Sequence, residues 1–459
     1  MGKELIIQTL KHESTKRIPW VPFVGVHAGK LVHYNATEML TDADKMYAGI
    51  MEAAKLFSPD GLPVIFDLQL EAEILGCELV WAPEAPPSVK THPLAETTDI
   101  PCDCTMPQKT DGRIPMVLDV MRRVKASIGD EVALYGLICG PFTLASHLRG
   151  NDIFMDMYDD DEYVHSLMAY TSKVVKQMAA YYIEAGMDVI ALVDPLVSQI
   201  SPDSFEEFVM EPFKDCFSYI REQGSLSSFF VCGNATRNID PMCQTNPDSI
   251  AVDENVDMVT AKAITDTYNI ALSGNIPLTT IMLHGNQQDN MKYVVELIDK
   301  LDPQNLIISP GCDMPYATPP ENTIAAAQAV LNTDSVRKMI ENYTGSAMDD
   351  IVVELPDYAS LRRPLIEVCT LDSETCAACT YMMDAANVAK AEFGDAIDVI
   401  EYKYTRKEDI ARFMKMGVQN LPSIYINGHL EYASIIPNRE KFAEKIRSYI
   451  PDTAASSED

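Results

Sequence analysis

Short apolar segments alternate with longer amphipathic stretches between about residue 20 and residue 335. Apolar runs of this kind, each followed by a helical period, are typical of strands in repeated βα units. Such units place their strands side by side in a parallel sheet, and eight of them fit a closed (β/α)₈ barrel of the TIM type. The predicted strands span residues 20–26, 62–66, 132–138, 187–193, 227–231, 249–252, 270–273 and 306–309.

A second, smaller pattern follows a polar segment, 344–362, that we expect to be a linker. It predicts a strand, a helix, a strand, a helix, a hairpin about Asn427-Gly428 and a closing helix. The ranges are 365–369, 376–393, 397–404, 407–416, 423–426 with 432–436, and 439–449. The predicted fold is therefore α/β, with a TIM barrel over 1–343, a smaller α/β domain over 363–451 and an acidic tail over 452–459.

Polar residues or cysteines follow nearly every predicted barrel strand, at the end where such barrels keep their chemistry. Each single member has an ordinary alternative, because strand ends and helix caps also select polar residues. We expect Asp67 and Asp194 to be catalytic, holding polar groups of the substrate or accepting protons. His27, Asn234 and Asn275 are expected to bind a cofactor at the same mouth.

Two thiols and a carboxylate among these residues suit zinc. Cys232, Glu254 and Cys312 follow the fifth, sixth and eighth predicted strands, so their side chains can converge above the barrel. Three such ligands leave a fourth tetrahedral position for a substrate, as in catalytic zinc sites. The alternative is that both cysteines are simply buried, since cysteine is among the most buried residue types.

Five motifs resemble the uroporphyrinogen decarboxylase superfamily, and more narrowly its methylcobamide:coenzyme M methyltransferase branch. They are Gly140-Pro-Phe-Thr-Leu-Ala, Val193-Asp-Pro with Ile200-Ser-Pro, Val231-Cys-Gly-Asn, Val252-Asp-Glu and Ser309-Pro-Gly-Cys-Asp, within about residues 1 to 340. The resemblance implies a zinc site made of a His-x-Cys pair, a Glu and a distant Cys. It also implies that zinc activates a thiol, which then takes a methyl group from a corrinoid.

One position departs from that pattern. Phe230 stands where the branch has its histidine ligand, and phenylalanine cannot bind a metal. Three alternatives follow: a weaker zinc site with only Cys232, Glu254 and Cys312, a different residue in place of the histidine, or loss of zinc binding. His27 is the candidate substitute, because the first strand neighbours the eighth in a closed barrel.

Cys376-Ala-Ala-Cys379 stands at the start of the long helix in the second domain. The amides and dipole of a helix N-terminus favour a thiolate there, which is typical of redox cysteines. With Leu421-Pro422-Ser423 before a later strand, the segment 363–451 resembles a thioredoxin or glutaredoxin-like domain. Half of a zinc site is the alternative, but no second CxxC accompanies it.

Composition and charge narrow the partners. The chain has 36 Lys and Arg against 68 Asp and Glu, a net charge of −32, so we expect neither nucleic acid nor anionic membranes to bind. It has no long apolar run or signal peptide, so we expect a cytoplasmic protein.

Eleven cysteines at irregular spacing do not suggest a secreted disulfide framework. Cys102 and Cys104 lie in a long loop, 81–113, and we expect neither a metal nor a disulfide there.

The favoured function is methyl transfer from a methylated corrinoid protein to a small thiol or a tetrahydrofolate-type acceptor that zinc activates. The fused dithiol domain would keep thiols reduced. A second hypothesis is a corrinoid- or tetrapyrrole-binding barrel without zinc catalysis that serves a thiol-disulfide oxidoreductase domain. Decarboxylation is a third, disfavoured because residues 24–30 offer only His27 and Lys30 in place of an arginine-rich motif. The oligomeric state is left open, a homodimer included.

Overall fold

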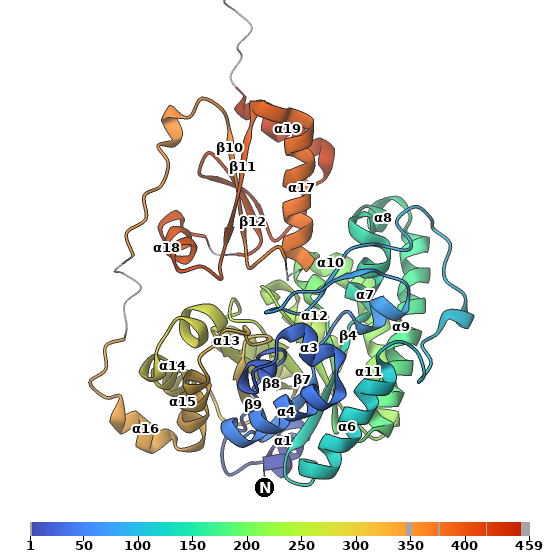
Figure 1. Cartoon of the computed structure of the whole chain (residues 1–459), viewed down its shortest axis with the longest axis vertical. Coiled ribbons are helices and arrows are strands. Elements are labelled where there is room, and N and C mark those ends of the chain that lie inside the picture. Colours follow the sequence, from blue (N-terminus) through green and yellow to red (C-terminus); the bar gives the residue numbers. More distant parts are fainter. Residues whose placement is uncertain (1, 346–350, 375–376, 419, 451–459) are drawn as a thin grey trace, which may run out of the picture. The chain divides into compact units, whose positions relative to one another are not determined.

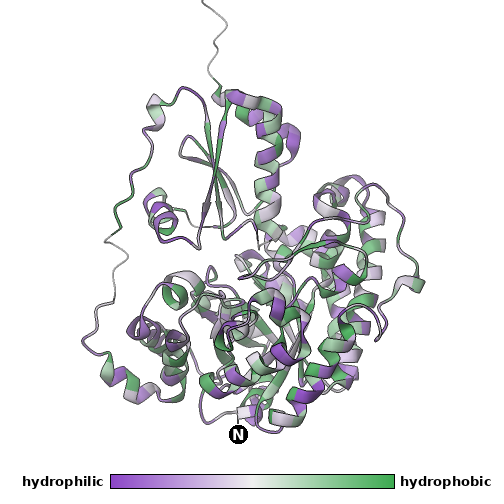
Figure 2. Ribbon diagram, viewed as in Figure 1, coloured by the Kyte–Doolittle hydropathy of each residue, from purple (hydrophilic) through white to green (hydrophobic). Residues whose placement is uncertain are grey.

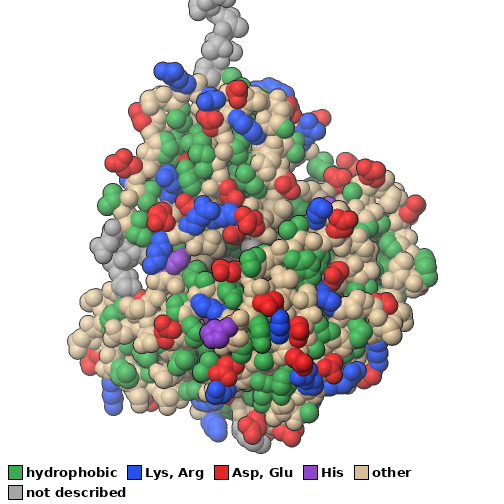
Figure 3. Space-filling view, in the orientation of Figure 1, with side chains coloured by type: hydrophobic (Ala, Val, Ile, Leu, Met, Phe, Trp, Pro, Cys, Tyr) green, Lys and Arg blue, Asp and Glu red, His purple; other side chains and the backbone are tan. Residues whose placement is uncertain are grey.

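The chain forms two compact units, Met1–Ser346 and Ala347–Asp459 (Figure 1). A computed structural model describes residues 2–345, 351–374, 377–418 and 420–450. In those ranges no helix is both long and apolar enough to cross a membrane. Acidic and basic side chains are interspersed on the face shown in Figure 3.

A seven-stranded parallel sheet organises the first unit, in the order β1-β4-β5-β6-β7-β8-β9. Its strands begin and end within three residues of the predicted ranges. They are β1 (Gly61–Ile65), β4 (Ala133–Cys139), β5 (Val189–Val193), β6 (Leu226–Val231), β7 (Ser249–Val252), β8 (Ala271–Ile276) and β9 (Leu306–Pro310).

The eighth predicted strand, residues 20–26, is reduced to a single bridge between Trp20 and Ile308. The Trp20 carbonyl accepts hydrogen bonds from the amides of Asp60 and Gly61, just before and at the start of β1, and Val21 donates to Ile308 in β9. Pro22 lacks the N–H that a longer ladder would require. This segment nevertheless joins both edges of the curled sheet, so the fold is TIM-like.

Inward-facing side chains of the strands fill the centre of the curled sheet. This inward cluster includes Phe23, Phe66, Tyr135, Leu137, Ala191, Val193, Phe230, Ala251, Ala271 and Ile307. The strands are largely green in Figure 2, whereas the surrounding helices carry purple outer positions, as amphipathic helices do. Alternation along each strand therefore decides which side chains face the centre.

Helices connect the strands and cover the outside of the sheet (Figure 1). They are α1 (Gly2–Leu10), α2 (His27–Leu31), α3 (Ala36–Thr41), α4 (Ala43–Phe57), α5 (Leu70–Ile74), α6 (Ile114–Ile128), α7 (Pro141–Arg149), α8 (Ile153–Asp159), α9 (Asp161–Glu184), α10 (Pro202–Ser204), α11 (Met210–Glu222), α12 (Ile239–Gln244), α13 (Met258–Thr267), α14 (Gln287–Lys300), α15 (Pro320–Leu331) and α16 (Thr333–Met339).

The loop between β1 and α6 carries a two-stranded ribbon, β2 (Leu79–Val80) and β3 (Ser88–Val89). A disulfide joins Cys102 and Cys104 further along it, so our expectation of unpaired cysteines there was wrong. Both residues are exposed. Thr105 holds the turn against α9 through a 2.7 Å hydrogen bond to the Tyr170 hydroxyl.

The second unit contains a four-stranded sheet in the order β11-β10-β12-β13. β10 (Leu365–Thr370) is parallel to β11 (Asp398–Lys403), whereas β12 (Ser423–Ile426) pairs antiparallel with β10 and with β13 (His429–Ala433). Its helices are α17 (Ala377–Phe393), α18 (Lys407–Met416) and α19 (Arg439–Tyr449). The Leu421-Pro422 peptide bond is cis.

The last strand of this sheet begins three residues earlier than predicted. Asn427 and Gly428 have φ values of +49° and +76°, so they form the whole two-residue turn. His429 therefore already pairs with Ile426, and the strand ends at Ala433 instead of residue 436.

Candidate functional site

The two cysteines predicted to meet above the barrel do so. Cys232 follows β6 and Cys312 lies two residues after β9, and a disulfide joins them with their Cα atoms 5.8 Å apart. Both pack against the inward cluster and both remain partly exposed. The carboxyl-end mouth of the sheet therefore presents a pair of sulfur atoms brought together from positions 80 residues apart.

Glu254, the carboxylate predicted to complete a zinc site with the two cysteines, does not point toward them. Ala251 belongs to the inward cluster, so the alternation along β7 turns Asp253 inward and Glu254 outward. Glu254 Oε2 accepts a hydrogen bond from the Leu278 amide. With Asn275 it lines a separate cavity of about 240 Å³. Burial, reinforced by the charge of Asp253, raises the pKa of Glu254 to about 8.

Two carboxyl groups that sequence reasoning did not assign lie next to the cysteines. Asp253 accepts hydrogen bonds from the amides of Gly233 and Asn255, and its own burial raises its pKa. Asp313 follows Cys312 directly, and its Oδ1 is buried without a hydrogen-bond partner in the described part of the chain. Strand alternation, applied to Ala251 and Asp253, was the signal that could have preferred Asp253 over Glu254.

His27 does not replace the missing histidine ligand. It is fully buried, its Nδ1 lies 3.0 Å from the Tyr316 carbonyl, and its ring stacks on Phe57 with centroids 6.0 Å apart. Burial lowers the pKa of His27 to about 4, so the ring is neutral. It helps to position the start of α2, and its predicted cofactor role has no support in these contacts.

The donor set therefore does not fit zinc. Sulfurs in a disulfide carry no thiolate charge, and a metal needs thiolates. The described residues include no group of three or more His, Cys, Asp or Glu side chains that could hold a metal ion. The predicted zinc set is not assembled, because Glu254 faces away and a phenylalanine stands at position 230.

Phe230 belongs to the inward cluster and its ring lies 4.7 Å from that of Phe23 and 5.8 Å from that of Phe66. We expect Phe230→His to lower the free energy of unfolding by about 2 kcal/mol or more, because it buries an imidazole that has no partner and loses ring contacts. Urea unfolding and zinc analysis of the same sample check this. Unchanged stability with one zinc per chain would contradict it, and Phe230→Leu serves as the apolar control.

Asp194, the residue after β5, caps a helix. Its fully buried carboxylate accepts hydrogen bonds from the amides of Phe142 and Thr143 and, at 2.5 Å, from the Thr143 hydroxyl, all at the start of α7. Gly140 leaves room for it, since a Cβ there would lie 2.3 Å from Oδ2. These contacts assign Asp194 a structural role and give no support to its predicted catalytic one.

Burial raises the pKa of Asp194 to about 7, well above about 3.9 in an unfolded chain. Between about pH 4 and pH 7 only the folded state keeps the Asp194 carboxyl protonated. Protonation therefore contributes its full stabilisation of the fold below about pH 4, and this contribution is lost as the pH rises to 7. From pH 5 to pH 8 we expect wild type to lose about 3 kcal/mol more stability than Asp194→Asn. Urea unfolding of both proteins checks this, and parallel pH profiles would contradict it.

Asp67 is likewise engaged in structure. Its side chain is fully buried, its Oδ2 lies 2.5 Å from Arg113 Nη1, and its Oδ1 accepts from the Gln69 amide. Arg113 also binds Glu73 at 2.8 Å. Glu71, fully buried on α5, has no partner for either carboxylate oxygen in the described chain, and burial raises its pKa to about 8.

The two predicted asparagines hold loops. Asn275 Nδ2 donates to the carbonyls of Asp253 (2.9 Å) and Val256 (2.7 Å). Asn234 Oδ1 accepts from the amide and hydroxyl of Thr236. Both residues therefore shape the mouth, and only the Oδ1 atom of Asn275 has no partner within the described ranges.

Buried polar atoms without a partner recur in the segments that follow the barrel strands. Native proteins leave few such atoms unpaired, so their recurrence favours a polar ligand or ordered water at this end. Counted over the described residues, they include His27 Nε2, Gln69 Oε1, Arg113 Nη2, Gln199 Oε1, Asn238 Oδ1, Asn275 Oδ1, Thr279 Oγ1, Asp313 Oδ1 and Thr318 Oγ1.

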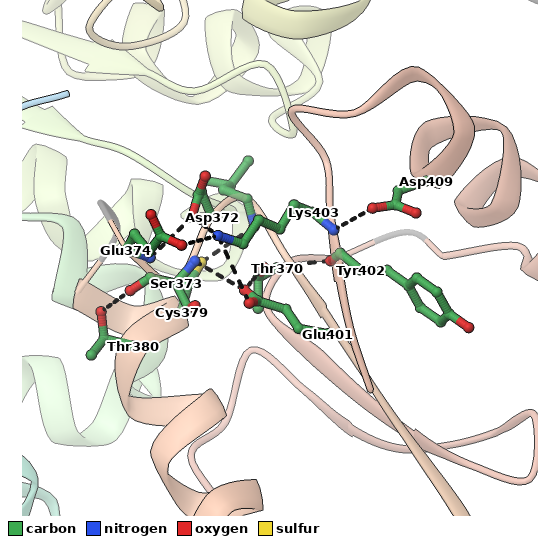
Figure 4. A network of polar contacts seen from close by, with 11 residues as sticks. Thr370, Asp372, Ser373, Glu374, Cys379, Thr380, Glu401, Tyr402, Lys403 and Asp409 are labelled. Atoms are coloured by element: carbon green, nitrogen blue, oxygen red, sulfur yellow. Dashed lines mark hydrogen bonds and ion pairs between the residues drawn. The ribbon is translucent and has the colours of Figure 1, made fainter. Parts of the chain in front are cut away.

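The second unit holds Cys379 beside a polar network (Figure 4). Cys379 is buried, and its Sγ accepts a 3.3 Å hydrogen bond from the Leu371 amide. The Lys403 ammonium, nearly buried, pairs with Asp372 at 2.7 Å and Glu374 at 2.8 Å. These contacts fix the loop before α17. Cys376, the other predicted redox cysteine, lies outside the described residues.

Comparison with known proteins agrees with this architecture. The model of the uroporphyrinogen decarboxylase (URO-D) family matches residues 1–332. A methylcobamide:CoM methyltransferase of Methanosarcina acetivorans is 28% identical over 329 residues, covering 70% of this chain and 94% of that protein. A uroporphyrinogen decarboxylase of Wolbachia pipientis is 26% identical over 306 residues, covering 64% and 86%.

Structural comparison points to the same fold. The solved structure of a methyltransferase from Methanosarcina mazei has a TM-score of 0.65 at 23% identity and covers 74% of this chain and 99% of that one. The family match lies within the first unit and spans well over half of the chain. The chain therefore belongs to the uroporphyrinogen decarboxylase family.

Proposed function

We propose that the barrel is a methyltransferase that takes a methyl group from a methylated corrinoid, carried by a corrinoid protein, and passes it to a small thiol. Its relatives include proteins named as methylcobamide:CoM methyltransferases. The observation that carries the proposal is the pair Cys232 and Cys312 at the mouth of the barrel. The Oδ1 atom of Asp313, the residue after Cys312, has no partner among the described residues and supports a polar ligand beside the pair.

The cysteine pair supplies a chemical role without a metal. In the reduced form, a thiolate Sγ of Cys232 or Cys312 would accept the proton of the incoming thiol. The thiol sulfur would bond to the methyl carbon as the carbon–cobalt bond breaks, and the electron pair of that bond would leave with the corrinoid. Cysteine and a small thiol have similar pKa values, which favours proton transfer between them. The corrinoid supplies the electrophilic methyl group when bound. The mouth orients the acceptor sulfur and keeps it near the base.

The direct test is methyl transfer from free methylcobalamin by the full chain, after reduction with a phosphine. Coenzyme M, other small thiols and tetrahydrofolate serve as acceptors. We expect methylated thiol, detected by mass spectrometry, with coupled loss of methylcobalamin. Methylation of tetrahydrofolate alone would change the acceptor class. No methyl transfer to any acceptor, with folded protein, would reject the proposal.

Decarboxylation has weaker support, although a uroporphyrinogen decarboxylase is among the relatives. The two cationic candidates near the first strand are occupied. Lys30 Nζ donates to the Ala317 carbonyl at 2.6 Å, and His27 is buried and neutral. Neither is placed to bind a substrate carboxylate.

For the second unit we propose a thioredoxin-like dithiol domain. The sheet order, the Leu421-Pro422-Ser423 segment at the start of β12 and the buried Cys379 at the start of α17 support it. Disulfide reduction by the full chain, lost in Cys379→Ser, tests the proposal. Equal reduction by wild type and variant would reject it.

A further inference from the structure

We propose that Cys232 and Cys312 form a thiol-disulfide exchange site, which small thiols reduce and small disulfides oxidise. The exchange itself does not depend on the proposed methyl transfer. The predicted effect of the redox state on methyl transfer does rest on that proposed function. The pair would alternate between a disulfide without thiolates and a dithiol with the catalytic base.

The sheet holds both cysteines at bonding distance. Val231 pairs with Val252, which fixes the residue before Cys232. The Gly311 amide donates to the Ile276 carbonyl at 3.0 Å, which fixes the residue before Cys312. The resulting Cα separation of 5.8 Å lies within the range that disulfides require. The bond can therefore open and close without displacing the strands.

Accessibility separates this pair from the free cysteines in the described part of the barrel. Cys232 and Cys312 are partly exposed, so a small thiol can reach their sulfur atoms. Cys77, Cys216 and Cys243 are buried, and burial raises the pKa of each thiol to about 12. Exchange requires a thiolate and access, which these buried thiols lack.

The surroundings also favour a sulfur-sulfur bond over a bridging metal. Two thiolates this close repel each other unless a cation or a bond joins them. The described residues include no group of three or more His, Cys, Asp or Glu side chains that could hold a metal, and Glu254 is held by the Leu278 amide. A disulfide needs no further ligand and satisfies both sulfurs.

The chemistry balances with two equivalents of a small thiol. One thiolate attacks a sulfur of the pair, breaks the Cys232–Cys312 bond and forms a mixed disulfide, releasing one cysteine thiolate. A second thiolate attacks the mixed disulfide, giving the free small disulfide and the second cysteine thiolate. Two thiols are oxidised, the protein disulfide gains two electrons, and the two thiol protons pass to the cysteines. The thiol class expected as methyl acceptor can therefore also act as reductant.

The test equilibrates the native full chain, without oxygen, in mixtures of reduced and oxidised glutathione. Free thiols are then alkylated and each cysteine is followed by peptide mass spectrometry. The variant Cys102→Ser/Cys104→Ser removes the exposed second disulfide and serves as the matched background. We expect the linked 232–312 peptide to vanish in reduced glutathione and to return in oxidised glutathione, while Cys77, Cys216 and Cys243 stay unlabelled throughout.

Three results would overturn the proposal. They are thiols at 232 and 312 under every ratio, a disulfide that opens only after unfolding in urea, and one zinc per chain that protects both thiols from oxidised glutathione. Methyl transfer is measured on the same samples and should rise with the reduced fraction. Reversible exchange without any methyl transfer supports the exchange site and rejects only the proposed function, whereas transfer independent of the redox state rejects the link between them.

Discussion

Replacing both Cys232 and Cys312 with serine should lower the rate of methyl transfer to a thiol acceptor by about 100-fold or more. Either single change should lower the rate less, because the remaining cysteine at the mouth of the barrel can still accept the proton. Serine keeps the size of the side chain but is far too weak an acid to provide the anionic base at neutral pH. Initial rates with methylcobalamin and coenzyme M, on phosphine-reduced protein, measure the effect.

Controls separate chemistry from folding. Cys243 is a buried cysteine in α12, away from the strand ends that carry the pair. Cys243→Ser should therefore leave the rate within a few-fold of wild type. Circular dichroism and urea midpoints of each variant exclude unfolding. Full activity in the double variant, with both cysteines replaced, would show that the sulfurs do not take part in the reaction.

Replacing Arg113 with methionine should lower the free energy of unfolding by about 3–5 kcal/mol, the cost of leaving one charge of a buried ion pair alone. Arg113 Nη1 lies 2.5 Å from the fully buried Asp67, and Nε binds Glu73. The nearby Glu71 carboxyl is also buried. Removing the only cation among these groups would strand Asp67 without a counter-charge. Urea unfolding measures the loss.

Arg123→Met is the matched control, since Arg123 lies on α6 and Arg113 is the residue just before that helix. Its ion pair with Asp44 is 2.9 Å long but exposed, so the loss should stay below about 1 kcal/mol. The double variant Arg113→Met/Asp67→Asn should recover part of the stability, because the stranded charge is removed as well. Equal effects of Arg113→Met and Arg123→Met would contradict the importance of burial.

The strand pattern was predictable because it depends on local chemistry. Apolar runs, turn residues and helical periods lie within short windows, and seven of the eight barrel strands follow them. The reduced pairing of the segment after Trp20 was not predictable from its own sequence pattern. Pro22 limits its hydrogen bonds, and the link between β1 and β9 is seen only in the folded sheet. The disulfide at Cys102 was missed because spacing alone does not show whether two sulfurs face each other.

The candidate site residues also fall into those that the strand positions predicted and those whose contacts they did not predict. Cys232 and Cys312 were found from the sequence because both follow strands of one parallel sheet, and such ends meet at one edge. Glu254 was predicted as a ligand together with the cysteines, and the resemblance implied a glutamate, but strand alternation turns Glu254 outward. Asp194 and Asp67 were assigned to catalysis because a carboxylate after a strand looks the same whether it meets a substrate or a helix amide.

The sequence by itself determined the order of strands and helices, the curled parallel sheet and the meeting of two distant cysteines, since these follow from hydrophobic period and chain direction. Only the tertiary structure decided what each polar side chain contacts. Asp194 binds the amides of α7, Asp67 pairs with Arg113, and His27 stacks on Phe57. Those partners come from elements far apart in the chain, and burial sets their charge, so no local pattern could specify them.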